Sequence, residues 1–356
     1  MSPFVNQPDL VIDAQSPKRD KSALLGAFES TFNLGVPSTR WEEIMLNIAR
    51  GIGAAVIVAM TVVPAFAQEK TVGYITKSAT NAGWIMINQG AADAAKSEGV
   101  KLIEVGPSFA GDLTKQLEIF ENLVGQHVDA IGIAPVDSSG IAPAVKDATS
   151  AGIPIVAIDT AVNGADVTSF VATDNVAVAK VQGAIAATLV SDGASIIYVT
   201  GDKAQSTGQD RYNGFMSAFK AARPKSEILE VPTVWDSNQA QEGVEAIINQ
   251  RKDIKMIVSA WDGGTMAAKS ALQNLGYKAG EVKLVGFDGA ADAVAAMDQG
   301  WVQANTAQML YQMGYQGIKA AAAAARGQQV EKRIDTGFFL ITPSTVDTYK
   351  AMIGIK

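Results

Sequence analysis

Tryptophan and aspartate side chains stand together in the sequence at points where short apolar runs end. Residues 257–270 read IVSAWDGGTMAAKS, so an apolar run passes directly into Trp261 and Asp262 and then into two glycines. Trp84 and Trp235 also stand near the ends of such runs, which accounts for three of the five tryptophans. Turn formation and helix capping explain an aspartate at such a point, but they give no reason for an indole ring beside it.

A polyhydroxylated ligand needs both kinds of side chain. Its hydroxyl groups need charged and amide partners that donate and accept hydrogen bonds in fixed directions, and its C–H faces need flat apolar surfaces such as indole. Asp159 and Asp288 directly follow apolar runs at 153–158 and 282–287 and offer such acceptors. The capping interpretation stays open for three other aspartates, Asp137, Asp202 and Asp262.

Several other chemistries lack the residues they need. The chain has no cysteine and one histidine, His127, which removes thiolate zinc sites, cysteine nucleophiles and, unless His127 is the base, a Ser-His-Asp triad. No phosphate-binding glycine motif follows the first apolar run. The net charge of −7, without a basic run interleaved with aromatics, argues against nucleic acid. We therefore expect no catalytic residue, metal or cofactor.

The elements that must position these residues alternate regularly from Thr71 onward. Apolar runs are followed by helical patterns, such as Asp112 to Gln126 with Asp112 as N-cap. Continuous apolar strands alternating with helices predict parallel sheets covered on both faces, with ligands beyond the strands' carboxyl ends. The apolar runs predict more strands than a single sheet comfortably holds. Two doubly wound α/β domains therefore fit the 356 residues better. The runs are 71–76, 101–105, 129–135, 153–158, 195–200, 227–232, 255–260 and 282–287.

The segment before this pattern reads as an export signal. Residues 51–67 carry no charge, Arg50 precedes them, and they end in Ala65-Phe66-Ala67. A positive start, an apolar middle and a small-residue end predict a signal peptide over 45–67, cleaved before Gln68. The mature chain would then lie outside the cytoplasm.

Two points about this segment stay open. An uncleaved membrane anchor is the alternative, although a spanning helix needs about 20 apolar residues and Pro64 interrupts this one. Met45, and not Met1, stands where a signal peptide should begin. We therefore interpret residues 1–44 as an extension from an upstream start codon.

Five segments, in order, resemble landmarks of the periplasmic sugar-binding proteins of the ribose, allose and galactose type, which feed ABC importers. The resemblance covers Lys70 to about Phe339. Repressors of the lactose-repressor type share this core but need an N-terminal helix-turn-helix, and this chain has the signal peptide there. The segments are TVGYITKSATNAGWIMINQGAADAAK, GIPIVAIDTAV, FVATDNVAVA, GQDRYNGFMSAF and KLVGFDGAADAV.

The resemblance implies the type I periplasmic binding fold: two doubly wound parallel-sheet lobes joined by a three-crossover hinge, with the sugar closed between them. The crossovers are expected near Thr173-Asp174, Gln308-Met309 and Gly337. The N-terminal lobe would span 68–173 plus 309–337, and the C-terminal lobe 174–308 plus 338–356.

The resemblance also implies which residues contact the ligand. Lys77 matches the allose type, but Gln209 falls where the ribose and allose types have an arginine, and Trp261 where they have an asparagine. Gly83 falls where many members have a second aromatic. These departures put ribose and allose in doubt, although Arg211 would restore the arginine if the register shifts by two. The expected contacts are Lys77, Asn81, Trp84, Asp159, Gln209, Trp235, Trp261, Asp288 and Gln308.

The expected function is therefore that of a non-enzymatic, monomeric receptor. It would capture a neutral monosaccharide or related polyol, close around it and present it to an ABC permease. A cyclitol, a sugar alcohol or a furanosyl signal molecule are alternative ligands, and a chemoreceptor or sensor kinase is an alternative partner. A glycoside hydrolase using two aspartates also stays open, since it needs carboxylates about 5–9.5 Å apart.

Overall fold

The computed structural model describes residues 69–78, 81–107 and 111–354. The expected signal peptide and upstream extension lie outside these residues. No helix in the described ranges is long and apolar enough to cross a membrane. Glu69–Lys356 form one compact unit.

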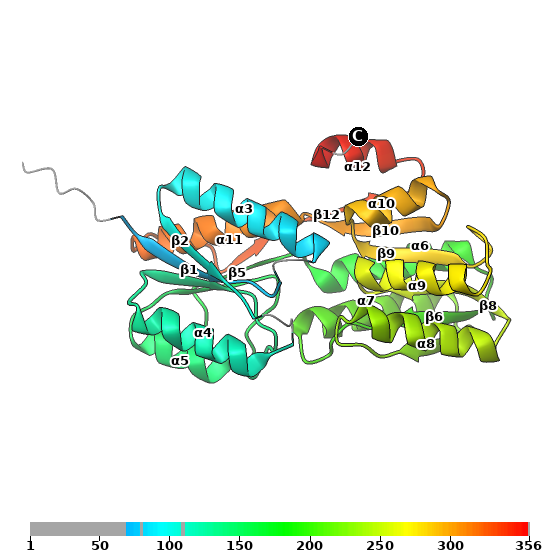
Figure 1. Cartoon of the computed structure of the whole chain (residues 1–356), viewed down its shortest axis with the longest axis horizontal. Helices are drawn as coiled ribbons and strands as arrows, with labels where there is room; N and C mark the ends of the chain where they lie inside the picture. Colours follow the sequence, from blue (N-terminus) through cyan, green and yellow to red (C-terminus); the bar gives the residue numbers. More distant parts are fainter. Residues whose placement is uncertain (1–68, 79–80, 108–110, 355–356) are drawn as a thin grey trace, which may run out of the picture. The chain divides into compact units, whose positions relative to one another are not determined.

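Two six-stranded sheets form the centres of two α/β lobes (Figure 1). The strand orders are β11-β5-β4-β3-β1-β2 and β12-β10-β9-β8-β6-β7. All the strand pairings are parallel except that between β10 and β12. The expectation of two doubly wound parallel-sheet lobes is confirmed.

The strands of the first sheet are β1 (Thr71–Ile75), β2 (Lys101–Val105), β3 (Ala130–Ile133), β4 (Ile155–Ile158), β5 (Ser169–Ala172) and β11 (Arg333–Asp335). Those of the second are β6 (Ser195–Val199), β7 (Glu227–Val231), β8 (Ile254–Ser259), β9 (Lys283–Asp288), β10 (Val302–Gln308) and β12 (Phe338–Ile341). Eight of these strands coincide with the predicted apolar runs, and every residue of β3 and β4 is buried. Burial on both faces is what a continuous apolar strand requires.

Helices cover both faces of each sheet. In the first lobe they are α3 (Ala82–Glu98), α4 (Leu113–Gly125), α5 (Ala142–Ser150) and α11 (Leu310–Ala325). In the second they are α6 (Asn175–Leu189), α7 (Ser206–Ala222), α8 (Ser237–Gln250), α9 (Asp262–Asn274), α10 (Ala291–Asp298) and α12 (Val346–Ile353). The predicted helix after β2 is confirmed as α4, and Asp112 caps it by accepting from the Lys115 backbone N–H at 2.9 Å.

One helix pair in each lobe packs through glycines. In the first lobe, a Cβ added at Gly90 of α3 would overlap the Tyr311 carbonyl oxygen, and one at Gly314 of α11 would overlap that of Ile87. In the second lobe, Gly183 and Gly214 allow the same close approach of α6 and α7. Because protein interiors are close-packed, these backbone contacts fix the distance between the helices.

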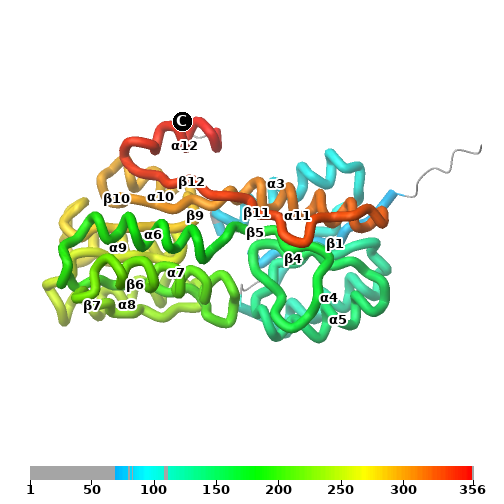
Figure 2. Tube along the Cα trace, turned by 180° about the vertical axis from the view of Figure 1, so that it is seen from behind, coloured from blue at the N-terminus to red at the C-terminus, as the bar shows by residue number. Residues whose placement is uncertain are grey.

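The chain passes between the two sheets three times: from β5 into α6, from β10 into α11, and from β11 into β12 (Figure 2). The first and third passages lie side by side. Thr173 Oγ1 is 3.2 Å from Thr336 Oγ1, and the Asp174 backbone N–H donates to Asp335 Oδ1 at 3.3 Å. These contacts tie two of the three connections together.

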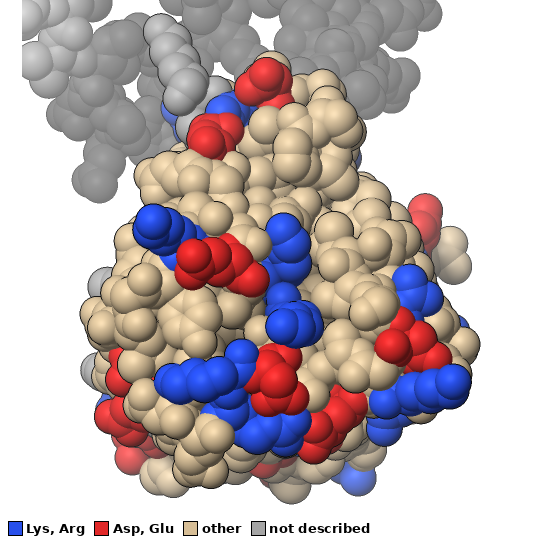
Figure 3. Space-filling view, turned by 90° about the vertical axis from the view of Figure 1, so that its right-hand side faces the viewer, with Lys and Arg blue, Asp and Glu red and all other residues tan. Residues whose placement is uncertain are grey.

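The outer end of the second lobe carries charges of both signs. Lys and Arg side chains lie beside Asp and Glu side chains on the face shown in Figure 3. In the same lobe Arg251 pairs with Glu227 at 2.7 Å and with Asp253 at 2.8 Å. Exposed pairs of this kind contribute little to stability.

Candidate ligand-binding site

A cavity of about 240 Å³ lies where the carboxyl ends of strands from both lobes meet. This is smaller than the roughly 300–1,000 Å³ typical of sites for drug-sized ligands. It therefore suits a molecule of monosaccharide size. Eight of the nine expected contact residues line it: Lys77, Asn81, Trp84, Asp159, Trp235, Trp261, Asp288 and Gln308.

Asp159 presents a carboxylate from the first lobe, directly after β4. Its φ of 66° is unusual for a residue other than glycine. Its Oδ2 accepts from Lys77 Nζ at 2.9 Å and from Thr160 Oγ1 at 2.7 Å. Burial alone would raise its pKa, but the charges of Lys77 and Arg211 and these hydrogen bonds outweigh burial and lower the pKa. Asp159 is therefore held as a carboxylate.

Lys77 follows β1 and is buried, with 4% of its surface exposed. Its Nζ donates to Asp159 Oδ2, to Thr160 Oγ1 at 2.6 Å and to Gln205 Oε1 at 2.6 Å. Burial lowers the pKa of Lys77, and the Asp159 charge partly opposes that shift. The ammonium also lies 5.6 Å from the centroid of the Trp84 ring.

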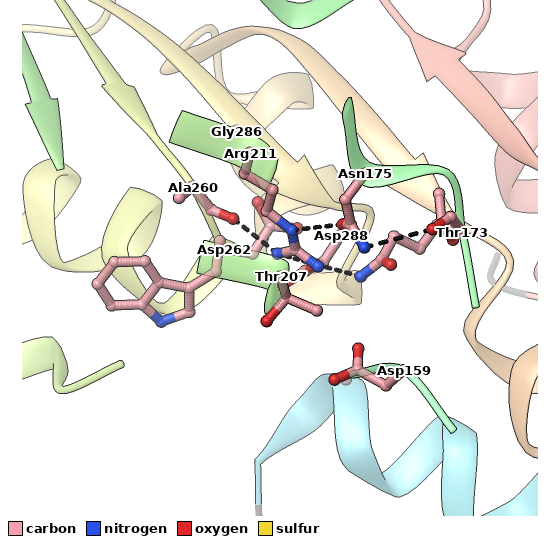
Figure 4. A network of polar contacts seen from close by, with 12 residues as sticks. Asp159, Thr173, Asn175, Thr207, Arg211, Ala260, Asp262, Gly286 and Asp288 are labelled. Atoms are coloured by element: carbon pink, nitrogen blue, oxygen red, sulfur yellow. Dashed lines mark hydrogen bonds and ion pairs between the residues drawn. The ribbon is translucent and has the colours of Figure 1, made fainter. Parts of the chain in front are cut away.

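Asp288 presents the second carboxylate, at the end of β9 with a φ of 107°. Its Oδ1 accepts from Arg211 Nη1 at 3.0 Å (Figure 4). The same oxygen accepts from Gln308 Nε2 at 2.7 Å. Burial raises the pKa of Asp288, and the Arg211 charge partly offsets this. Arg211 is fixed in turn by Asn175 Oδ1 at 2.8 Å and by the Ala260 carbonyl at 2.7 Å.

The structure corrects the expected placement of Gln209. Its side chain is exposed, lies outside the cavity and donates to the Lys203 carbonyl at 2.8 Å. Arg211 lines the cavity instead, with 3% of its surface exposed. Two residues along a helix of 3.6 residues per turn are about 200° apart, so only one of the pair can face inward. The alternative register, with Arg211 as the arginine of the site, is the one present.

Aromatic rings form much of the remaining wall. Trp235 and Trp261 meet edge to face, with ring centroids 5.4 Å apart and planes at 89°. Trp84 lines the cavity from α3, whose first turn is capped by Asn81 Oδ1 accepting from Gly83 N–H at 3.0 Å. Asn81 therefore has a capping role as well as a place at the cavity.

Asp262 does not line the cavity. It is buried and accepts from the Ala290 backbone N–H at 2.8 Å and from Asn305 Nδ2 at 2.7 Å. Burial and the nearby Asp288 charge raise its pKa well above the ordinary value. The two other aspartates left open are turn residues and not helix caps: Asp137 accepts from Gly140 N–H at 2.7 Å and Asp202 from Ala204 N–H at 2.9 Å, while the N-caps of α5 and α7 are Ile141 and Gln205.

The sequence did not single out every residue at the cavity. Gln205 and Thr207 line it from the start of α7, and Ile87 and Leu310 line it from helices of the first lobe. Gln205 follows the apolar run that forms β6, so its position at a strand's carboxyl end was the available signal. The two apolar residues carry no chemical signal in the sequence.

Two buried polar atoms at the cavity have no hydrogen-bond partner among the described residues. They are Gln308 Oε1, an acceptor, and Trp235 Nε1, a donor. Both atoms belong to residues that line the cavity but are themselves inaccessible to water. Unpaired buried polar atoms are costly, and pairing either of these two would require a local movement of its side chain.

Two α/β lobes with a small ligand-sized cavity between them are the architecture of a two-lobed binding protein. Comparison with known proteins supports this class. Residues 72–329 match the family model of the periplasmic binding protein domain, so the chain belongs to that family. The members of this family are substrate-binding proteins of transporters. The chain has the type I fold of the family.

Curated relatives extend over most of the chain. It is 30% identical over 264 residues to the D-allose-binding periplasmic protein of Escherichia coli (strain K12), covering 72% of this chain and 85% of that protein. It is 28% identical over 276 residues to the ribose import binding protein RbsB of Bacillus subtilis (strain 168), covering 77% and 88%. The expected resemblance to the ribose and allose types is confirmed.

Solved structures agree on the fold. An ABC transporter solute binding protein from Agrobacterium vitis, bound with alpha-D-tagatopyranose, has a TM-score of 0.74, 26% identity, and coverage of 81% of this chain and 99% of that one. Another from Mycobacterium smegmatis, with bound glycerol, has a TM-score of 0.73, 28% identity, and coverage of 79% and 96%.

Proposed function

We propose that this protein is an extracytoplasmic receptor that binds a neutral monosaccharide or related polyol between its lobes and delivers it to an ABC import permease. One observation carries the proposal. Each lobe presents a carboxylate bonded to a buried cation, Asp159 with Lys77 and Asp288 with Arg211, and both carboxylates line one small cavity with tryptophan walls.

The pairing of charges supports a neutral ligand. An anionic sugar needs a free cation, but Lys77 and Arg211 both form ion pairs inside the protein. A cationic ligand needs a free carboxylate in the same way. Hydroxyl groups instead suit fixed charge pairs, because each hydroxyl both donates and accepts. The proteins with bound tagatopyranose and glycerol show that this fold accepts polyols of different size.

Binding by lobe closure is part of the proposal. The three passages between the sheets would form the hinge, with crossovers near Thr173-Asp174, Gln308-Met309 and Gly337. The ligand would stabilise the closed state by contacting both lobes at once. The closed form would then be the one that the permease recognises.

A thermal-shift screen of the purified protein tests the ligand class. The panel should contain pentoses, hexoses, sugar alcohols and cyclitols, with a sugar phosphate and a uronic acid as anionic controls. A true ligand at a hundred times its Kd stabilises the fold by about 2.7 kcal/mol. Stabilisation by only the anionic compounds would refute the neutral-ligand proposal.

Export is a further part of the proposal. We expect cleavage before Gln68, after the Ala65-Phe66-Ala67 sequence. N-terminal sequencing of the protein recovered from a periplasmic extract checks this. A cytoplasmic chain that retains Met1 would contradict export.

A further inference from the structure

Lys77 joins the two lobes inside the cavity. Two of its three acceptors, Asp159 Oδ2 and Thr160 Oγ1, belong to its own lobe. The third, Gln205 Oε1 at 2.6 Å, belongs to the second lobe, at the N-cap of α7. This is a direct polar contact from one lobe to the other.

The hydrogen bonds use the whole donor capacity of this side chain. An ammonium group has three N–H bonds and no acceptor, and the three acceptors lie 2.6 to 2.9 Å from Nζ. No N–H is left to donate to a ligand oxygen. Lys77 lines the cavity, but its ammonium group donates all its hydrogen bonds to protein acceptors.

Neighbouring contacts hold the same segment of the second lobe. The Ser206 backbone N–H donates to Ser138 Oγ at 2.9 Å, and Ser206 Oγ accepts from the Ala161 N–H at 2.9 Å. The Ser138 N–H donates to the Ala204 carbonyl at 3.1 Å. The loops after β3 and β4 of the first lobe thus hydrogen-bond with residues 204–206 of the second lobe.

We propose that Lys77 and Gln205 form an interlobe latch, which strengthens ligand binding by stabilising the closed lobes and not by contact with the ligand. The inference rests on the proposed function. Closure removes water from the Lys77 ammonium, and a buried charge needs a full set of partners. The first lobe supplies two acceptors, and only closure brings Gln205 as the third.

A latch changes affinity in a recognisable way. The apparent Kd is the intrinsic Kd divided by the fraction of protein in the binding-competent state. Loss of the latch lowers that fraction, so every ligand should weaken by the same factor. Loss of a ligand hydrogen bond would instead weaken only ligands that carry the matching hydroxyl.

The test compares Gln205→Leu with Gln209→Leu. Both substitutions remove the same amide near the start of α7, but Gln209 is exposed and outside the cavity, which makes it a matched control. Because the chain has no cysteine, spin labels can be placed without background. Lys146→Cys on α5 and Glu242→Cys on α8 are exposed positions, one on each lobe, and pulsed electron paramagnetic resonance gives the distance between them.

Gln205→Leu should move the ligand-free distance distribution toward longer distances, and Gln209→Leu should leave it at that of the unsubstituted protein. Gln205→Leu should also raise the Kd of every ligand found in the screen by one common factor of about ten to a hundred. An unfolding transition at the temperature of the control excludes general destabilisation. If Gln205→Leu is destabilised, Gln205→Met, which removes the same amide and keeps an unbranched side chain of similar length, serves as the second latch variant with the same two readouts.

An unchanged ligand-free distance distribution overturns the latch, and so does a loss of affinity limited to ligands with one particular hydroxyl. The distance measurement needs no ligand. If the thermal-shift screen finds no ligand, the proposed function is contradicted. The spin-label distances would still test the latch.

Discussion

Each lobe has an aspartate at the same position of its sheet, and the pKa values of the two aspartates are shifted in opposite directions. β4 and β9 are each third in the order of their sheets, and Asp159 and Asp288 stand at their carboxyl ends. Both have positive φ, 66° and 107°. Yet the pKa of Asp159 is lowered, and the pKa of Asp288 is raised.

The difference comes from the neighbours of each carboxylate. Asp159 accepts directly from Lys77 and Thr160 and also feels the charge of Arg211. Asp288 has Arg211 and Gln308 as donors, but burial dominates its pKa, and the charge of Asp159 raises that pKa further. Equivalent positions in a repeated fold therefore do not imply equivalent protonation. Asp288 of the second lobe depends more strongly than Asp159 on its donors, Arg211 and Gln308, to stay ionised.

The largest expected effect is the loss of the second-lobe carboxylate. Asp288→Ala removes up to two charge-assisted hydrogen bonds to the ligand, at about 1.5–3 kcal/mol each, or roughly two to four decades of affinity. It also leaves Arg211 buried without its carboxylate. Asp288→Asn keeps one acceptor and should lose less. Calorimetric titration gives the order, and binding of folded Asp288→Ala within threefold of the unsubstituted protein would remove Asp288 from the site.

A smaller effect is expected from the aromatic wall of the same lobe. Trp261→Ala removes the apolar surface against a ligand C–H face and the edge-to-face contact with Trp235. Burial of a large apolar side chain is worth about 1.5–3 kcal/mol, so we expect a loss of about one to two decades. Titration of Trp261→Phe should show a partial recovery. Equal affinity of Trp261→Ala and the unsubstituted protein would show that the ring only fills the core.

The smallest effect concerns pH and the contrast between the two carboxylates. Because the pKa of Asp288 is raised above 3.8 and that of Asp159 is lowered below it, acidification protonates Asp288 before Asp159. If the carboxylate is the binding form, affinity falls as pH decreases through the raised value, before Asp159 is affected. Titrations between about pH 4 and 7 should show a severalfold decline, reduced in Asp288→Asn. A decline of the same size and midpoint in Asp288→Asn would assign the pH dependence to another group.

Much of the fold could be predicted because burial on both faces makes parallel strands apolar. β10 escaped prediction because it reads VQANTAQ and is nonetheless almost wholly buried. Its Asn305 donates to Asp262, so a polar pair replaces the apolar signal. Asp159 and Asp288 could be found because both follow predicted strands.

The remaining parts of the site depend on quantities that a sequence does not carry. Whether Gln209 or Arg211 faces the cavity depends on the rotational phase of α7, and its N-cap, Gln205, makes no side-chain capping hydrogen bond that would reveal where the helix begins. The role of Gln205 depends on where the other lobe lies. Local patterns cannot report a contact between residues 128 positions apart.

The glycine contact between α3 and α11 bears on how the ligand range of such a protein can change. Trp84 lies near the start of α3, and α11 follows directly after the cavity residue Gln308. A Cβ at Gly90 or Gly314 would overlap the backbone of the facing helix, so we expect an alanine there to separate α3 from α11 and to shift Trp84, which stands on α3. The expected width of the cavity therefore depends on the absence of a Cβ atom at Gly90 and Gly314. We therefore expect a substitution at Gly90 or Gly314 to change ligand preference without any contact between that residue and the ligand.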